Sequence, residues 1–278
     1  MKKLLSVAAS LAAVLSLSSC FQSETTVHLN KDGSGTLVEE TLLGAQMIAM
    51  MDQMAAGFGG GGDAKQDPIK EMFSEEKAKK RAAELGEGVT FDKSEPVDKN
   101  GSKGARVTYK FKDINTIKVS TGDGMKNMSP MGDMPGQPQA KKEEPIRFAY
   151  ADGKLTVKLP HPKADKPKEG EEKPAAEDQE MPDLNSPEGQ QMKQMFADMK
   201  MSLKLVVDSG IEETNASYKD GNTITLMEMN FGKLIENPDG FKKLQSVDQK
   251  NPTAAMEALK GIDGVKVETK EEITVKVK

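Results

Sequence analysis

Stretches in which apolar and polar residues alternate recur along the chain, and this period of two predicts β-strands with one buried face. Residues 24–30 and 36–43 alternate in this way on either side of the turn dipeptide Asp32-Gly33, so they predict a β-hairpin. A second hairpin is predicted for 146–150 and 155–159 around Asp152-Gly153. Further strands are predicted at 89–91, 107–111, 202–207, 211–218 and 223–229, with a closing hairpin of 265–267 and 273–277.

Apolar residues at helical spacing predict helices between the strands. Two of these helices, at 44–56 and from Ser186-Pro187 onward, are rich in methionine. We interpret their methionines as packing faces, with a groove for a partner or a lipid as the alternative. The methionines concerned are Met47, Met50, Met51 and Met54 in the first helix and Met192, Met195 and Met199 in the second.

Other helices are indicated by their end signals. Asp67 is a good N-cap with Pro68 at the first helical position, and Gly86 stands where a left-handed cap belongs, which predicts one helix over 68–85. Pro238 and Pro252 each predict the start of a short helix. Strands outnumber helices and tight turns join neighbouring strands, so the sequence predicts an α+β fold: antiparallel sheet or sheets with helices packed on one face.

Composition divides the chain into segments. Two stretches lack periodicity and are rich in Pro, Gly, Lys and Glu, which predicts long disordered linkers. A shorter glycine-rich linker is predicted at 57–67. The predicted division is a leader at 1–19, an N-terminal α+β segment at 20–119, a flexible Met/Gly/Pro linker at 120–144, a β-hairpin at 145–159, a disordered Pro/Lys/Glu linker at 160–185, and a C-terminal α+β segment at 186–278. Whether the two α+β segments share one sheet stays open at this point.

The first twenty residues have the pattern of an export signal. Lys2 and Lys3 precede an uncharged apolar stretch, residues 4–17, which is too short to be a permanent membrane span. The stretch ends in Leu17-Ser18-Ser19-Cys20, and this resembles the lipobox of bacterial lipoproteins. The resemblance implies that signal peptidase II recognises the first three of these residues and cuts before Cys20, which carries a diacylglycerol and an N-acyl chain.

Cysteine usage agrees with this interpretation. Cys20 is the single cysteine of the chain, so an intramolecular disulfide and a cysteine-based zinc site are excluded. The alternative is an ordinary secretory signal that ends near a free thiol, which is a liability in an oxidising compartment. Phe21, not Asp, follows the cysteine. The resemblance therefore implies that the inner-membrane retention signal is missing and favours the outer membrane.

The turn that follows the first predicted strand carries a second resemblance. The opening pattern resembles that of the LppM-like envelope lipoproteins: an apolar strand, then Asp32-Gly33-Ser34-Gly35, then an apolar return strand. This resemblance implies an envelope lipoprotein and assigns no residue a role.

Composition limits the partners. The formal net charge is −5, and removal of Lys2 and Lys3 with the leader makes it more negative, so no electrostatic footprint for nucleic acid exists. The same balance argues against a polybasic second anchor. The predicted partners are membrane lipid, through the acyl anchor, and an envelope protein or a lipid ligand.

One segment suggests metal chemistry. Met125, Met128, Met131 and Met134 recur at every third residue, and Pro and Gly between them make a continuous helix unfavourable. Thioether sulfur selects Cu(I) or Ag(I), and this Met-rich segment resembles the loops of envelope copper-handling proteins. Cu(I) binding by these four residues is one hypothesis. A disordered linker that shares the chain's general richness in methionine is the other.

Signatures of catalysis are scarce. His28 and His161 have no adjacent motif, and the sequence contains no Gly-x-Ser-x-Gly elbow, phosphate loop or dinucleotide loop. Pairs such as Glu39-Glu40 and Glu212-Glu213 are interpreted as solvated surface charges. We therefore predict a non-catalytic envelope lipoprotein that binds a protein or a lipid, with no cofactor beyond its acyl chains. A Cu(I)-handling lipoprotein is the alternative, and a carboxylate-based hydrolase comes third.

Overall fold

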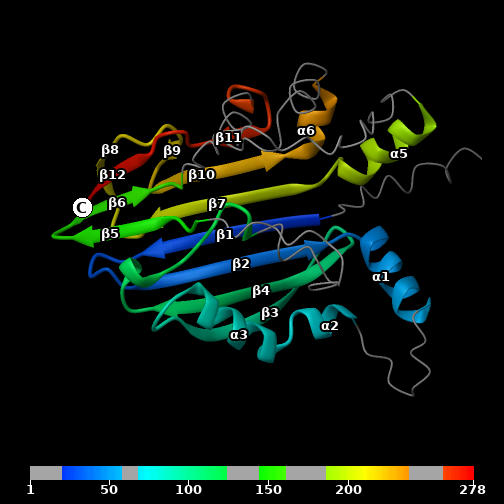
Figure 1. The fold of residues 1–278 in the computed structure, drawn as a ribbon, viewed down its shortest axis with the longest axis horizontal. Coiled ribbons are helices and arrows are strands. Elements are labelled where there is room, and N and C mark those ends of the chain that lie inside the picture. Colours follow the sequence, from blue (N-terminus) through cyan, green and yellow to red (C-terminus); the bar gives the residue numbers. More distant parts are fainter. Residues whose placement is uncertain (1–20, 58–67, 124–143, 161–185, 238–258) are drawn as a thin grey trace, which may run out of the picture.

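The fold contains two β-sheets, with helices grouped mainly at one end of the larger one (Figure 1). A computed structural model describes residues 21–57, 68–123, 144–160, 186–237 and 259–278. The strands are β1 Phe21–Leu29, β2 Gly35–Leu43, β3 Thr90–Lys99, β4 Ser102–Phe111, β5 Arg147–Ala151, β6 Lys154–Lys158, β7 Lys200–Val207, β8 Ile211–Thr214, β9 Lys219–Asp220, β10 Thr223–Asn230, β11 Val265–Val267 and β12 Glu272–Val277.

The large sheet has the order β11-β10-β7-β1-β2-β4-β3, and β9 adds to β10. Its central pair, β1 and β7, is parallel, while the other pairs of the described strands are antiparallel. Because β1 comes from the predicted N-terminal segment and β7 from the C-terminal one, the two α+β segments share this sheet. The second sheet, β5-β6-β12-β8, is antiparallel.

The hydrophobic core lies on one face of the large sheet. Along β1 the residues at odd positions, from Phe21 to Leu29, are buried, and those at even positions are half-buried or exposed. The buried side chains of both sheets belong to one continuous cluster, which Ala78, Ala82 and Leu85 of α3 also join. The second sheet and α3 therefore cover the same face of the large sheet. The opposite face, which we call the open face, carries the polar positions of the strands.

Helix ends follow the capping chemistry of the sequence. The helices are α1 Ala45–Gly57, α2 Pro68–Met72, α3 Glu75–Leu85, α5 Pro187–Phe196 and α6 Phe231–Glu236, with the 3-10 helix η1 Ile114–Thr116. The Ser186 side chain accepts a hydrogen bond from the Gly189 N–H, and Pro187 occupies the first turn of α5. Ser74 begins α3 in the same way, with two glutamates following in the first turn.

The turn between β1 and β2 shows why its glycines are needed. Gly33 has a φ of +87°, and an added Cβ there would lie 3.1 Å from the Tyr150 ring. At Gly35 a Cβ would lie 1.9 Å from the backbone oxygen of His28. The Tyr150 hydroxyl donates to the backbone oxygen of Lys31 at 2.6 Å. Gly33 is therefore required by its positive φ and by the packing of Tyr150, and Gly35 by the close approach of the β1 backbone.

The predicted fold class, α+β with antiparallel sheets, is confirmed. Four predicted features are wrong. The strand predicted at 211–218 ends at Thr214, and Gly86 after α3 has φ +141° and ψ +169°, which is not the left-handed cap conformation. The helix over 68–85 is two helices, because the chain bends at Phe73 and Ser74 caps α3. The closing hairpin does not form, because β11 pairs with β10 in the large sheet and β12 pairs with β6 and β8 in the second sheet.

Most of the predicted linkers, and the helices predicted at Pro238 and Pro252, lie outside the described residues. The first residues of the 120–144 linker, Ser120 to Asp123, belong instead to the folded part of the chain. Both Ser120 and Asp123 are buried, and the Asp123 carboxylate accepts a hydrogen bond from the Ser120 N–H at 2.9 Å.

Candidate functional site

The residues that the sequence singles out for chemistry lie outside the described parts of the chain. This holds for Leu17, Ser18, Ser19 and Cys20 of the lipobox and for the Met-rich segment, Met125 to Met134. Lipidation and Cu(I) binding therefore stay predictions. Among the described residues, no group of three or more His, Cys, Asp or Glu side chains is placed to hold a metal ion. None of the helices in the same residues is long and apolar enough to cross a membrane.

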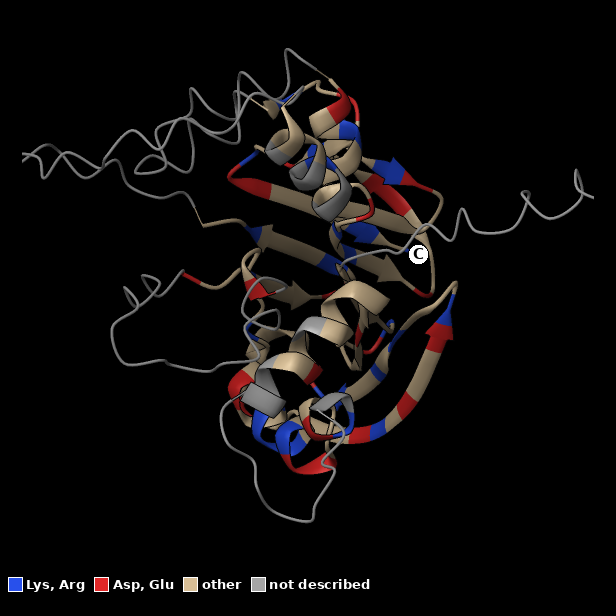
Figure 2. Ribbon diagram, turned by 90° about the vertical axis from the view of Figure 1, so that its right-hand side faces the viewer, with Lys and Arg blue, Asp and Glu red and all other residues tan. Residues whose placement is uncertain are grey.

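The start of β1 lies at one end of the molecule, beside three helices. Phe21, the residue after Cys20, is fully buried and pairs with Leu43 at the end of β2. Two residues beyond Leu43, α1 begins. Figure 1 shows α1, α5 and α6 at this same end, and Figure 2 looks directly onto it. We call it the helical end. The opposite end, with the β1–β2 turn and the second sheet, is the hairpin end.

Helix α1 has few charges and few buried side chains. Of its thirteen residues, Asp52 is the single charged one, and Lys and Arg are absent. Met51 is buried, Met47 and Ile48 are half-buried against the core, and Ala45 and Ala49 are exposed. The interpretation of the methionines as a packing face is confirmed for Met47 and Met51 here. It is also confirmed for the buried Met199 that follows α5; the side chains of Met50, Met54, Met192 and Met195 lie outside the described set.

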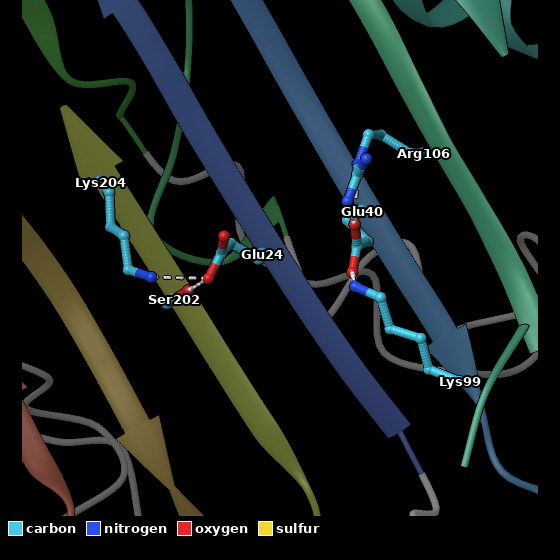
Figure 3. Close-up of polar contacts among 6 residues, drawn as sticks. All are labelled: Glu24, Glu40, Lys99, Arg106, Ser202 and Lys204. Carbon is cyan, nitrogen blue, oxygen red and sulfur yellow. Dashed lines mark hydrogen bonds and ion pairs between the residues drawn. The ribbon is translucent and has the colours of Figure 1, made fainter. Parts of the chain in front are cut away.

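The open face of the large sheet carries a row of ion pairs across its central strands (Figure 3). Glu24 on β1 and Glu40 on β2 lie directly opposite each other, an arrangement that repulsion destabilises on its own. Cations from the outer strands compensate each carboxylate. Lys204 of β7 lies 2.6 Å from Glu24, where Ser202 also donates its hydroxyl at 3.2 Å.

Glu40 is the better enclosed of the two carboxylates. Lys99 reaches one of its oxygens at 2.6 Å, and Arg106 of β4 reaches the other through Nε at 2.8 Å. Desolvation raises the pKa of Glu40, but the hydrogen bonds from Lys99 and Arg106 outweigh it and hold that pKa below its ordinary value. Three cations therefore surround the two carboxylates of the row, and their contacts join β7 to β1 and both β3 and β4 to β2. Within the described parts of the chain, the open face is a broad polar surface.

A buried ionic group, which we call the Arg81 cluster, joins α3 to the large sheet. The Arg81 guanidinium donates to one Glu39 oxygen through Nε at 3.2 Å and through Nη2 at 2.9 Å, and Nη2 also lies 3.1 Å from Asp123 Oδ2. The side chains of Arg81, Glu39 and Asp123 are 18%, 9% and 7% exposed. The cluster thus connects α3, β2 and the chain after η1.

The electrostatics of this cluster follow from its two acids and one base. Desolvation lowers the pKa of Arg81, but the charges of Glu39 and Asp123 outweigh it and raise that pKa, so the guanidinium stays charged. Burial, and then the nearby Glu39 charge, raise the pKa of the Tyr109 hydroxyl. The interpretation of Glu39-Glu40 as a solvated surface pair is wrong for Glu39. The pair Glu212-Glu213 is exposed, as predicted.

His28 lies on β1, as predicted, near the hairpin end. Its Nδ1 is 3.1 Å from Asp208 Oδ1 just beyond β7, and both side chains are partly exposed. The Asp208 N–H donates to the backbone oxygen of Leu29. The His28–Asp208 contact therefore lies where the parallel pairing of β1 with β7 ends. His161 lies outside the described residues.

Sequence reasoning missed the Arg81 cluster and the row of ion pairs. A signal for Glu39 was present, because it falls in the same alternating phase as the buried Leu37 and Leu43. No comparable signal exists for the row, because its cations lie between 59 and 180 residues from their carboxylates in the sequence.

Comparison with known proteins yields one match. No protein-family model and no curated protein matches the chain. Among solved structures, the folded domain of the LppM protein of Mycobacterium tuberculosis, determined by NMR, is similar at 8% sequence identity. The match covers 77% of this chain and 85% of that one, with a TM-score of 0.27. This is a distant likeness.

Proposed function

We propose that the chain is an exported cell-envelope lipoprotein, cut before Cys20 and anchored by acyl chains on that residue. Its α+β domain binds another envelope protein or a lipid at the membrane surface and catalyses no reaction. The observation that carries the proposal is the position of the first strand. β1 begins at Phe21, directly after the predicted attachment point, and Phe21 is fully buried. The predicted cut therefore leaves β1 whole, with its first residue held in the core and paired with Leu43.

The strength of the anchor follows from its chemistry. Each buried methylene contributes about 0.8 kcal/mol, and a single acyl chain holds a protein only marginally. A diacylglycerol with a further N-acyl chain makes release very slow. Because Phe21 replaces the Asp that retains some lipoproteins in the inner membrane, the proposed location is the outer membrane.

The open face is the surface proposed for partner binding. It spans the width of the large sheet, and solvent reaches its charged side chains. A photo-crosslinking residue at Thr26 of β1 should capture a partner in intact cells. The same residue at Ala149, on the outer surface of the second sheet, is the matched control. If both positions gave the same crosslinked products, the open face would not be the partner-binding surface.

The anchor is tested by mass spectrometry of the native protein. The expected N-terminal peptide begins at Cys20 and carries the mass of a diacylglycerol and an N-acyl chain. A C20S chain should keep its leader and lack acyl groups. An S18A chain, which preserves a small residue in the lipobox, should be processed normally. An intact leader, or a bare thiol at the new N-terminus, would overturn the proposal.

A further inference from the structure

We infer that the domain stands on the bilayer through its helical end, with α1 resting against the lipid headgroups. This inference rests on the proposed function, since it requires the acyl anchor on Cys20. The partner of the helical end is the membrane that holds the acyl anchor.

The first step is the absence of slack between the anchor and the described fold. Phe21 is fully buried and paired with Leu43, so its position in the domain is fixed. Consecutive Cα atoms are about 3.8 Å apart, and acyl chains on Cys20 lie in the hydrocarbon. One residue cannot hold the domain away from the headgroups. The end of the molecule at which β1 begins must therefore touch them.

The second step identifies what makes the contact. The Cα atoms of Phe21 and Leu43 face each other across an antiparallel pair, about 5 Å apart, and Ala45 follows two residues later. The first turn of α1 thus lies within roughly 15 Å of the anchoring residue. Figure 1 shows α1 at this end of the molecule, beside the ends of β1 and β2.

The third step concerns the chemistry of α1. Its exposed positions include Ala45, Gln46, Ala49 and Gln53, and Asp52 is its single charge. Among the described side chains of α1, the exposed ones are small or polar, and the helix contains no Lys or Arg, so it gives no electrostatic attraction to anionic lipid. Contact is imposed by the short tether. It should therefore be the same on neutral and on anionic membranes.

The hairpin end is placed by the same argument. β1 has nine residues at about 3.4 Å each, so the β1–β2 turn lies about 30 Å from the start of the strand. Figure 1 shows the second sheet at that end, opposite α1, so the inferred orientation turns it away from the bilayer. A probe on α1 and a probe at the hairpin end should therefore report very different distances to lipid.

The chain has no Trp, so a single introduced Trp reports alone. Acylated A49W protein would be placed in phosphatidylcholine vesicles that contain dansyl-labelled phosphatidylethanolamine, and energy transfer from Trp to dansyl measured. A151W, an exposed position at the end of β5, is the matched control. We expect several-fold stronger transfer from A49W. Replacing part of the phosphatidylcholine with phosphatidylglycerol should leave the transfer unchanged.

A flexible Gly-Ser insertion between Cys20 and Phe21 in the A49W chain should lower the transfer to the A151W level. Flotation of the same samples on a density gradient tests the acyl anchor separately from the contact of the helical end with lipid. A chain that floats but shows equal transfer from both positions, or no effect of the insertion, overturns the end-on contact and leaves the anchor intact. A chain that does not float overturns the anchor and the contact together.

Discussion

Replacement of Arg81 by methionine tests the energetic role of the Arg81 cluster. Methionine keeps an unbranched side chain but removes the charge and its donors. Glu39 would then lie in the interior without the guanidinium that it pairs with, and Asp123 would lose its contact with Arg81. Because both carboxylates are less than a tenth exposed, the behaviour of buried ion pairs applies. Removing one partner of such a pair costs about 3–5 kcal/mol. We expect the free energy of unfolding of R81M to fall by about that amount.

The geometry also predicts the result for a conservative change. Arg81 holds Glu39 with two N–H groups, at 2.9 and 3.2 Å, while contacting Asp123 at 3.1 Å. Lysine keeps the positive charge but has a point-like ammonium in place of the planar fork. R81K should therefore lose about 1–2 kcal/mol, roughly the net value of one or two hydrogen bonds.

Urea denaturation of the wild type, R81M and R81K measures these differences in the free energy of unfolding. K79M is the matched control, because Lys79 lies on the same helix and pairs with Glu75 in an exposed ion pair with 63% of each side chain in solvent. Such a pair contributes about 0.3–0.5 kcal/mol. If R81M lost no more than K79M, the reasoning about buried charge would be refuted.

Four further outcomes are expected. G35A should lose at least about 1–3 kcal/mol in urea denaturation, because the new Cβ would lie 1.9 Å from the His28 backbone oxygen; an unchanged midpoint would contradict the packing of the turn. Because the pKa of Glu40 is lowered in the fold, its stabilisation is present above the ordinary carboxyl pKa and is lost as pH falls through the lowered one. E40Q should therefore show less acid destabilisation than the wild type. A chain without residues 1–20 should be soluble without detergent, and a need for detergent would reveal a second membrane-binding surface. The alternative, Cu(I) handling, predicts that titration of the mature protein with Cu(I) against a competing chelator shows binding that is lost when the four methionines of the Met-rich segment become leucine; equal curves would leave that segment a linker.

The β-hairpins and most helix starts could be predicted because their signals are local. The turn at Asp152-Gly153 has the positive φ angles that these residues tolerate, 49° and 74°, and the strands on either side pair as expected. Ser186-Pro187 predicted the start of α5 from capping chemistry alone. Ser74, followed by two glutamates, offered the same signal for α3 and is the reason that one predicted helix became two.

The closing hairpin failed for a non-local reason. Between β11 and β12, the buried Glu268 carboxylate accepts hydrogen bonds from the N–H groups of Thr269 and Lys270 and from both the N–H and the hydroxyl of Ser217. These bonds turn the chain from one sheet to the other. Ser217 is 51 residues away in sequence, so the alternation within 265–277 contains no trace of it. The ion pairs of the open face could not be predicted for the same reason, because their partners are also far apart in the sequence.

The parallel pairing of β1 with β7 has a consequence for how the chain is made. Partners such as Glu24 and Lys204 are separated by 180 residues. At about 5–20 residues per second, β1 waits roughly 10–40 s before β7 has been synthesised. Its hairpin with β2 closes far sooner, so one long edge of a hydrophobic strand stays open in the interval and can join a neighbouring chain. If the chain is exported as proposed, a holding chaperone would shield this edge of β1 until β7 is available to pair with it.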